Sequence, residues 1–297
     1  MTSPVAGEGA DFRRLDFELP SRGGQMAAID LGDPGRAFDM VFIHANGFNA
    51  RTYLELLRPL AKDQRILMPD LRGHGRTSLQ AAPEGRRSWN DHFADIAALL
   101  DQLGQPVVMA GHSMGGTTAL AASWLRPAVG AAVVLFDPVI WSRPAALAFG
   151  LPGMGRVSAR IPLVKGALRR RRGFPDREAA FAAYRGRGAF RDWPDAMLRD
   201  YLADGLVADP HGEGLILACA PEWEASNYAA QAHNPWRVLD RIKAPVRILR
   251  AEQASTCAVG PSPTRGRRSE VVPGGTHFFP MVMPDVARQA LSEALMG

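Results

Sequence analysis

Short, continuous runs of apolar residues recur along the first half of the chain, and they constrain the fold more than any other feature of the sequence. Each run ends where a Gly, Asn, Asp or Pro interrupts it. Runs without polar alternation are typical of strands that are buried on both faces of a mainly parallel sheet. The clearest are MVFIHA from Met40, RILMPDL from Arg65, PVVMAG from Pro106 and AAVVLFD from Ala131.

Segments with helical spacing accompany these runs. Apolar residues recur every three to four positions from Asp91 to Leu103, with Ser88 as the expected N-cap and Gly104 as the expected stop. LDFELP from Leu15 and MAAIDLG from Met26 predict an opening antiparallel pair. The pattern as a whole predicts an α/β fold, with a mostly parallel central sheet flanked by helices.

The alternation of strands and helices stops between residues 139 and 236. This segment is rich in Pro, Gly and Arg, and its clearest helical patterns are FPDREAAFAAYR and WPDAMLRDYLADGL. The alternation resumes at PVRILRAE from Pro245 and ends with SEVVPGG and a helix from Asp285 to Met296. We therefore expect residues 13–138 and 237–297 to form one core, and residues 139–236 to form a helical cap inserted into it.

The motif GHSMGG, residues 111–116, directly follows the strand pattern PVVMA and directly precedes the helical pattern TTALAASWL. A serine in a tight turn between a strand and a helix is the arrangement of a nucleophile elbow. Flanking glycines let the backbone pass closely, and the N–H groups at the helix start face the developing negative charge. Ser113 is thus the expected nucleophile; the alternative is a glycine turn with only a structural role.

Four motifs in this order resemble those of the α/β-hydrolase superfamily, and the likeness covers nearly all of the chain after the first dozen residues. The motifs are Asn46-Gly47-Phe48, DLRGHG from Asp70, GHSMGG from Gly111, and GGTHF from Gly274. The resemblance implies a serine hydrolase that cleaves an ester-like bond through an acyl-enzyme. It implies His277 as the general base, because the histidine follows the last strand in this family.

The resemblance also implies an oxyanion hole made of two backbone N–H groups. One belongs to Met114, directly after the nucleophile, and the other to Phe48 in the loop after the third strand. Asn46 stands where many members of the superfamily have a histidine.

The acid of the triad has several candidates. In most of the superfamily it follows the strand that ends here at Leu249, but the matching position holds Ala254. Asp137 directly ends the strand AAVVLFD, which is an acid position in some families with this fold, and we prefer it. Glu252 is the alternative acid, and Glu224 in the cap is a further one.

A largely apolar pocket is expected beneath the cap, since four of the six tryptophans lie between residues 139 and 236. For each of them the alternative is a place in the small core of the cap. The side chains expected to line the pocket are Asn46, His112, Trp141, Trp223 and Phe278.

Charge and residue spacing limit the kinds of molecule that the protein is expected to bind. The net charge is +5 and the pI about 9.7, and much of the excess lies in Lys165–Arg172. Such a run is either a surface for phosphate, acidic lipid or nucleic acid, or a solvated helix face; we favour the solvated face and expect no nucleic-acid partner. The histidines have no metal-ligand spacing, so we expect a small-molecule substrate, no metal and no organic cofactor.

The sequence also bears on the compartment. Two cysteines, Cys219 and Cys257, are too few for a disulfide framework. The sequence has no run of 18 apolar residues, so we expect no membrane span. The N-terminus lacks the pattern of a secretory signal. We therefore expect a cytoplasmic protein. The oligomeric state is left open.

Several reactions share the predicted triad. A C–C bond hydrolase, a lactonase and a perhydrolase are alternatives to an esterase, and a small-ligand sensor with little turnover is an alternative of another class. A serine at the elbow, where an aspartate would be needed, disfavours epoxide hydrolysis and haloalkane dehalogenation through an aspartyl ester.

Overall fold

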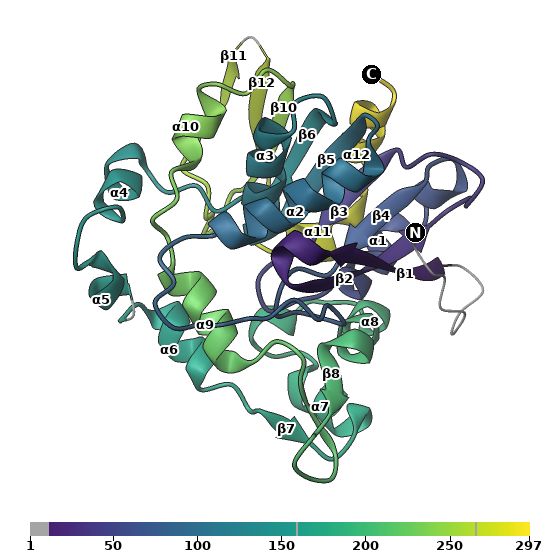
Figure 1. Ribbon diagram of the computed structural model, residues 1–297, viewed down its shortest axis with the longest axis vertical. Helices are drawn as coiled ribbons and strands as arrows, with labels where there is room; N and C mark the ends of the chain where they lie inside the picture. Colours follow the sequence, from purple (N-terminus) through teal and green to yellow (C-terminus); the bar gives the residue numbers. More distant parts are fainter. Residues whose placement is uncertain (1–11, 159, 265) are drawn as a thin grey trace.

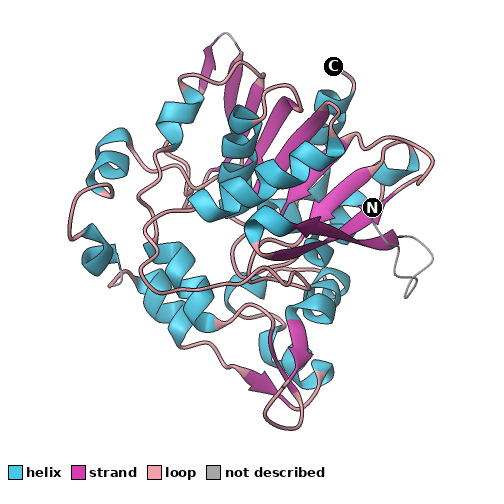
Figure 2. Cartoon of the chain, in the orientation of Figure 1, coloured by secondary structure: helices cyan, strands magenta, loops and turns pink. Residues whose placement is uncertain are grey.

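The computed structural model describes residues 12–158, 160–264 and 266–297. Within these residues a nine-stranded sheet forms the centre of the molecule, and helices cover both of its faces (Figures 1 and 2). Six adjacent strands are parallel, and antiparallel strands flank them at both ends, which confirms the predicted α/β class. In spatial order the strands are β1 (Phe12–Leu19), β2 (Gly24–Leu31), β4 (Ile66–Pro69), β3 (Met40–Ile43), β5 (Val107–His112), β6 (Gly130–Phe136), β10 (Val246–Ala251), β12 (Arg267–Val272) and β11 (Ser262–Thr264).

Continuous apolar runs form the central strands because both faces of the sheet are covered. Every residue of β3 and β5 is buried. Phe42 packs into the core on one face, whereas Val41 and Ile43 pack into the core on the other. Burying one such side chain stabilises the fold by roughly 1.5–3 kcal/mol, more than a typical surface ion pair. The first core contains α1 (Leu54–Leu57), α11 (Phe279–Val282) and α12 (Pro284–Leu295), and the second contains α2 (Asn90–Leu103), α3 (Met114–Leu125) and α10 (Pro235–Leu239).

Helix α2 begins and ends close to its predicted bounds, but the residue predicted as its N-cap is wrong. Gly104 follows it with φ 64°, as the expected stop requires. The N-cap is Trp89 and not Ser88, and no side chain caps the helix. Trp89 is buried, and its indole Nε1 donates a 2.9 Å hydrogen bond to the Asn227 carbonyl. A tertiary contact therefore anchors this helix start.

Residues 139–236, which we call the insertion, are helical in part only. A small antiparallel sheet in the order β7-β9-β8 was not predicted, because its strands have two or three residues and carry no readable alternation. The Asp176 side chain does cap α7, accepting a 2.7 Å hydrogen bond from the Ala179 N–H. The elements of the insertion are α4 (Arg143–Ala148), α5 (Met154–Ser158), α6 (Pro162–Leu168), β7 (Gly173–Phe174), α7 (Arg177–Tyr184), α8 (Asp195–Gly205), β8 (Leu206–Ala208), β9 (Leu215–Leu217) and α9 (Pro221–Ala229).

The carboxyl ends of the parallel strands meet at one edge of the sheet, where ligands bind in open α/β folds. The motifs found in the sequence follow β3, β4, β5 and β12 at this edge. In the described ranges, no helix has both the length and the apolar character needed to cross a membrane.

Candidate active site

Ser113 occupies a strained turn between β5 and α3. Its backbone has φ 56° and ψ −121°, a combination that residues other than glycine rarely adopt. The turn is also crowded. A Cβ atom on Gly115 would lie 2.2 Å from the Ile43 carbonyl oxygen, and one on Gly111 would lie 2.6 Å from the backbone of Gly115. Both glycines are therefore required for the close approach that holds Ser113 at the wall of a cavity.

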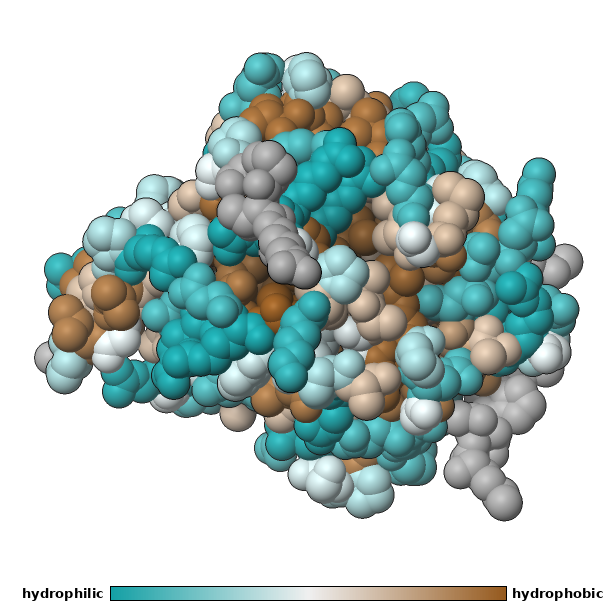
Figure 3. All heavy atoms as spheres, turned by 90° about the horizontal axis from the view of Figure 1, so that it is seen from above, coloured by the Kyte–Doolittle hydropathy of each residue, from teal (hydrophilic) through white to brown (hydrophobic). Residues whose placement is uncertain are grey.

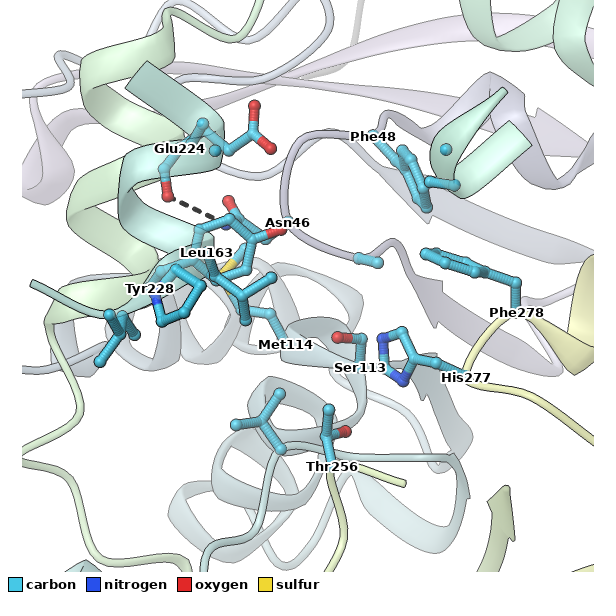
Figure 4. A pocket seen from close by; sticks show the side chains of 18 of the residues that line it. Asn46, Phe48, Ser113, Met114, Leu163, Glu224, Tyr228, Thr256, His277 and Phe278 are labelled. Atoms are coloured by element: carbon cyan, nitrogen blue, oxygen red, sulfur yellow. Dashed lines mark hydrogen bonds between the residues drawn. The ribbon is translucent and has the colours of Figure 1, made fainter. Parts of the chain in front are cut away.

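His277 lies beside Ser113 at this wall (Figure 4). Its Nδ1 donates a 2.6 Å hydrogen bond to Oδ2 of Asp137, which directly follows β6. Because Nδ1 is engaged with a carboxylate, a neutral His277 ring carries its proton there and has Nε2 free as an acceptor. That is the tautomer needed to remove a proton from a serine hydroxyl.

The Asp137 carboxylate is fully buried and saturated with hydrogen bonds. Oδ1 accepts from the Ala251 N–H at 2.9 Å and from the Ser255 hydroxyl, and Oδ2 accepts from the Thr256 N–H at 3.0 Å. Burial by itself would raise the pKa of Asp137, but the bonds from His277, Ser255 and Thr256 outweigh it and lower the pKa to about 2. Asp137 is therefore ionised at neutral pH.

The two other candidate acids have different partners. Glu252 is exposed, and its Oε2 accepts a 2.8 Å hydrogen bond from the Gly274 N–H. It thus holds the loop that carries His277 without contacting the ring. Glu224 is buried and forms a 2.5 Å ion pair with Arg170. The structure brings Asp137, and neither glutamate, to His277.

The two expected oxyanion donors differ in their present hydrogen bonding. In the described part of the chain, the Met114 N–H at the first turn of α3 has no acceptor. The Phe48 N–H donates to the Ala45 carbonyl at 3.2 Å, at the long end of the usual range. This turn includes Gly47 with φ 76°. A substrate oxygen would share the Phe48 N–H with Ala45 or displace that contact.

His112 lies behind the site and joins two of its loops. Its Nε2 is 2.8 Å from the His277 carbonyl oxygen, which can only accept, so Nε2 carries the proton. Its Nδ1 then accepts from the Tyr53 hydroxyl at 2.8 Å, and the Tyr53 oxygen accepts from the Ala45 N–H at 3.1 Å. Burial, followed by the nearby His277, lowers the pKa of His112 to about 3. The ring is therefore neutral.

Asn46 connects the loop after β3 to the insertion. Its Nδ2 donates to the Glu224 carbonyl at 3.0 Å, and its Oδ1 accepts from Asn227 Nδ2 at 2.8 Å. Both partners belong to α9. The neighbouring Gly47 N–H donates to His74 Nε2 at 3.1 Å. Both polar groups of the Asn46 side chain are thus hydrogen-bonded, and they tie the loop to α9.

A cavity of about 790 Å³ lies above Ser113 and His277, between the sheet edge and the insertion. Asn46, Trp141 and Phe278 line it, as expected from the sequence. Figure 4 shows Phe48 and Phe278 on one side of Ser113, and Leu163 and Tyr228 on the other. Most of the lining is apolar or aromatic.

Two residues expected in the pocket, His112 and Trp223, lie elsewhere, so these two predictions are wrong. His112 is fully buried in the network described above and does not reach the cavity. Trp223 is also buried, donating a 2.8 Å hydrogen bond from Nε1 to the Arg72 carbonyl, with Arg86 stacked 4.0 Å from its ring. Both side chains belong to helix or strand positions that turn away from the cavity.

The basic run Lys165–Arg172 is not wholly a surface feature. Arg170 lines the cavity and forms the ion pair with Glu224, which also lines it. The sequence held a signal for this arrangement, because Val164, Ala167 and Arg170 are three positions apart and share one side of α6 and its continuation. Val164 and Ala167 are indeed the buried residues of α6.

No group of three or more His, Cys, Asp or Glu side chains that could hold a metal ion occurs among the described residues. The groups at the site are a hydroxyl, an imidazole, a carboxylate and backbone N–H donors. Together they are suited to nucleophilic attack on a carbonyl carbon, with stabilisation of the oxyanion that results.

The sequence matches the model of the Alpha/beta hydrolase family over residues 40–290. This range holds most of the chain, including Ser113, Asp137 and His277. The chain therefore belongs to the α/β-hydrolase family and is a hydrolase.

Individual relatives match either a short segment of the chain or most of the chain at low sequence identity. Lipase LipV of Mycobacterium tuberculosis is 46% identical over 78 residues, which are 25% of this chain and 28% of that protein's length. The 3-hydroxybutyrate-oligomer hydrolase of Cupriavidus necator is 25% identical over 271 residues, 88% of this chain and 86% of the relative. Among solved structures, that of E-2-(acetamidomethylene)succinate hydrolase has a TM-score of 0.73 and 21% identity, covering 96% of this chain and 100% of its own. That likeness shows the fold.

Proposed function

We propose that this hydrolase cleaves an ester-like bond of a small, largely apolar substrate, with Ser113 as the nucleophile. The observation that carries the proposal is the 2.6 Å contact between His277 and Asp137, next to Ser113 at the wall of the cavity. The family places such a triad at the carboxyl edge of the sheet. The names of the relatives, a lipase and an oligomer hydrolase, agree with an ester substrate.

In the proposed reaction, His277 Nε2 takes the proton of the Ser113 hydroxyl while Oγ attacks the carbonyl carbon. The carbonyl π electrons move to oxygen, and the N–H groups of Met114 and Phe48 stabilise this charge. The protonated ring is stabilised by the Asp137 carboxylate, and it returns the proton to the departing alkoxide. A water molecule, deprotonated by His277, then attacks the acyl carbon. The bond to Ser113 Oγ breaks, the ring returns the proton to Oγ, and the acid is released.

The cavity supports a substrate with a substantial apolar part. Its volume of about 790 Å³ falls within the usual range for small-molecule sites. The insertion supplies much of the wall opposite Ser113, and we propose that it acts as a cap that selects the acyl or aryl group. The Arg170–Glu224 pair, together with Arg187 and Gln231, places polar groups on this wall.

The proposal is tested by labelling and by turnover. A fluorophosphonate reagent should label Ser113, and Ser113→Ala should lower kcat for 4-nitrophenyl esters by about 10⁶-fold, as in other triads. Ser142→Ala, an exposed serine at the start of α4, is the matched control and should keep full activity. Labelling at another residue, or substantial turnover by pure Ser113→Ala, would refute the assignment. Stoichiometric labelling with only a few turnovers would indicate a ligand sensor.

A further inference from the structure

The segment between Asp137 and Asp176 contains eight Arg and Lys residues and no acidic residue, whereas the rest of the chain contains 27 basic and 30 acidic residues. The whole positive excess of the protein therefore lies in this one part of the insertion. It contains α4, α5, α6 and β7. A protein with this distribution has a strong charge asymmetry, which orients it toward anionic surfaces.

Part of this charge is neutralised within the protein, and part is not. Arg143, Arg170 and Arg172 form ion pairs with Asp240, Glu224 and Glu222, respectively. Arg160, Lys165 and Arg169 are exposed. In the described part of the chain these three have no acidic partner.

The same segment exposes large apolar side chains. Of the ten large apolar residues exposed in the described chain, five lie between residues 147 and 168, with exposed fractions from 47% to 65%. Figure 3 shows apolar surface at the end of the molecule where Figure 1 places α4 and α5. We call these five residues and the three unpaired cations the basic apolar surface; its members are Leu147, Leu151, Val157, Arg160, Leu163, Lys165, Leu168 and Arg169.

Helix α6 shows why these side chains face outward. Its inner side packs against α9 through Val164 and Ala167, which contact Ala225 in a small separate core. Leu163, Leu168 and the two cations of the basic apolar surface on this helix and its end are exposed around the rest of its circumference. Exposed leucines next to exposed cations on a short helix are typical of a segment that lies on a lipid surface.

The basic apolar surface adjoins the mouth of the cavity. Leu163 is 53% exposed and also lines the cavity (Figure 4). Its neighbours Ile161 and Pro162 line the cavity as well. A lipid molecule that leaves a membrane beside Leu163 would reach the cavity without passing through water. Docking and substrate entry would therefore use the same side of the molecule.

We propose that the basic apolar surface docks this hydrolase onto an anionic lipid surface, with the mouth of the cavity facing the lipid. The unpaired cations are attracted to anionic headgroups, and the leucines enter the boundary between headgroups and acyl chains. A second copy of the chain fits this surface less well, because a two-fold interface would bring like charges together.

The test is binding of the full chain to vesicles, followed by sedimentation. Vesicles of equal parts phosphatidylglycerol and phosphatidylcholine should bind the protein, more weakly as salt rises, and vesicles of phosphatidylcholine alone should not. Lys165→Glu with Arg169→Glu should weaken binding by about tenfold or more, since each cation near an anionic membrane contributes about fivefold. Leu147→Ser with Leu151→Ser should also weaken it.

The matched control is Lys62→Glu with Lys243→Glu, which changes the net charge equally but outside the insertion. This control should bind the vesicles as the unmodified chain does. Equal binding to both kinds of vesicle, or equal loss in the control, would overturn the proposal. So would binding to duplex DNA in place of vesicles, or a dimer that the Leu147→Ser and Leu151→Ser pair dissociates.

Vesicle binding does not depend on catalysis, so this proposal and the proposed function can fail separately. The two surface variants change residues outside the cavity lining, and both should turn over a water-soluble short-chain ester normally. That turnover also verifies that they fold. With an ester embedded in anionic vesicles, the same variants should lose activity in proportion to their lost binding; full activity there would contradict lipid docking.

Discussion

His277 Nδ1 and Asp137 Oδ2 lie 2.6 Å apart, although 140 residues separate the two in the chain. Asp137 follows β6 and His277 follows β12, and β10 lies between these strands in the sheet. The contact therefore depends on the order of three parallel strands. It also depends on the donor-rich loop after β10, where the Ser255 hydroxyl and the Thr256 N–H donate to the carboxylate and hold it in place.

Replacement of Asp137 by Asn should lower kcat/KM for an ester by at least about 10³-fold, because the tautomer and charge of the His277–Asp137 pair are lost while the shape is kept. Glu252→Gln is the matched control, and its loss should stay below about tenfold on the same scale of acid effects. Circular dichroism verifies folding of both. The reverse order of the two losses would move the acid role to Glu252.

His112 should act as a positioning residue for His277. His112→Ala removes the donor to the His277 carbonyl and should lower kcat by about tenfold to 100-fold, with little change in KM, since small displacements of catalytic groups have effects of this size. His112→Gln can present an N–H near the same place and should recover much of the activity. Tyr53→Phe keeps the His112–His277 bond and should lose less. Equal losses in the alanine and glutamine variants would indicate a packing role alone.

Buried histidines should make the protein less stable as pH falls below neutrality. Burial lowers the pKa of His44 to about 4 and the pKa values of His112 and His233 to about 3. In the unfolded chain these rings titrate near 6.5, so the unfolded state binds more protons between pH 6.5 and the folded pKa values. Their contribution is complete above pH 6.5 and declines as pH falls through that window.

Urea unfolding at a series of pH values measures this decline as a falling free energy of unfolding between pH 7 and pH 4. His112→Gln should show a shallower slope than the unmodified protein, because one titrating group is removed. The depressed pKa of Asp137 acts in a lower window: its contribution is present above about pH 4 and is lost as pH falls to about 2. An unchanged slope in His112→Gln would contradict a buried, neutral His112.

A side chain added at Gly166 should shorten the preferred acyl chain. Gly166 lines the cavity, and a Cβ atom there would meet no heavy atom within 4 Å. Gly166→Phe should therefore fill part of the cavity and lower kcat/KM for long-chain 4-nitrophenyl esters relative to the acetate. Leu168→Phe is the control on the same helix, exposed and outside the cavity lining. A parallel shift in both variants would argue against the cavity as the acyl site.

The nucleophile turn could be predicted from the sequence because its determinants are local. A buried strand, a serine between glycines and a helix follow one another within residues 107–125, and no distant contact is needed to specify them. The parallel sheet could be predicted for a similar reason, since continuous apolar runs are stable only where both faces are covered.

The sequence favoured Asp137 as the partner of His277 without excluding the two glutamates, and it predicted the walls of the cavity only in part. Asp137, Glu252 and Glu224 were all compatible with the chain order, and strand order decided which carboxylate meets the imidazole. His112 and Trp223 are of residue types that often line pockets, yet both side chains are packed in the interior. Local pattern determines which backbone conformations are favoured over a few residues; which side chains meet across 140 positions is decided by the packing of whole elements, and only the tertiary structure contains that information.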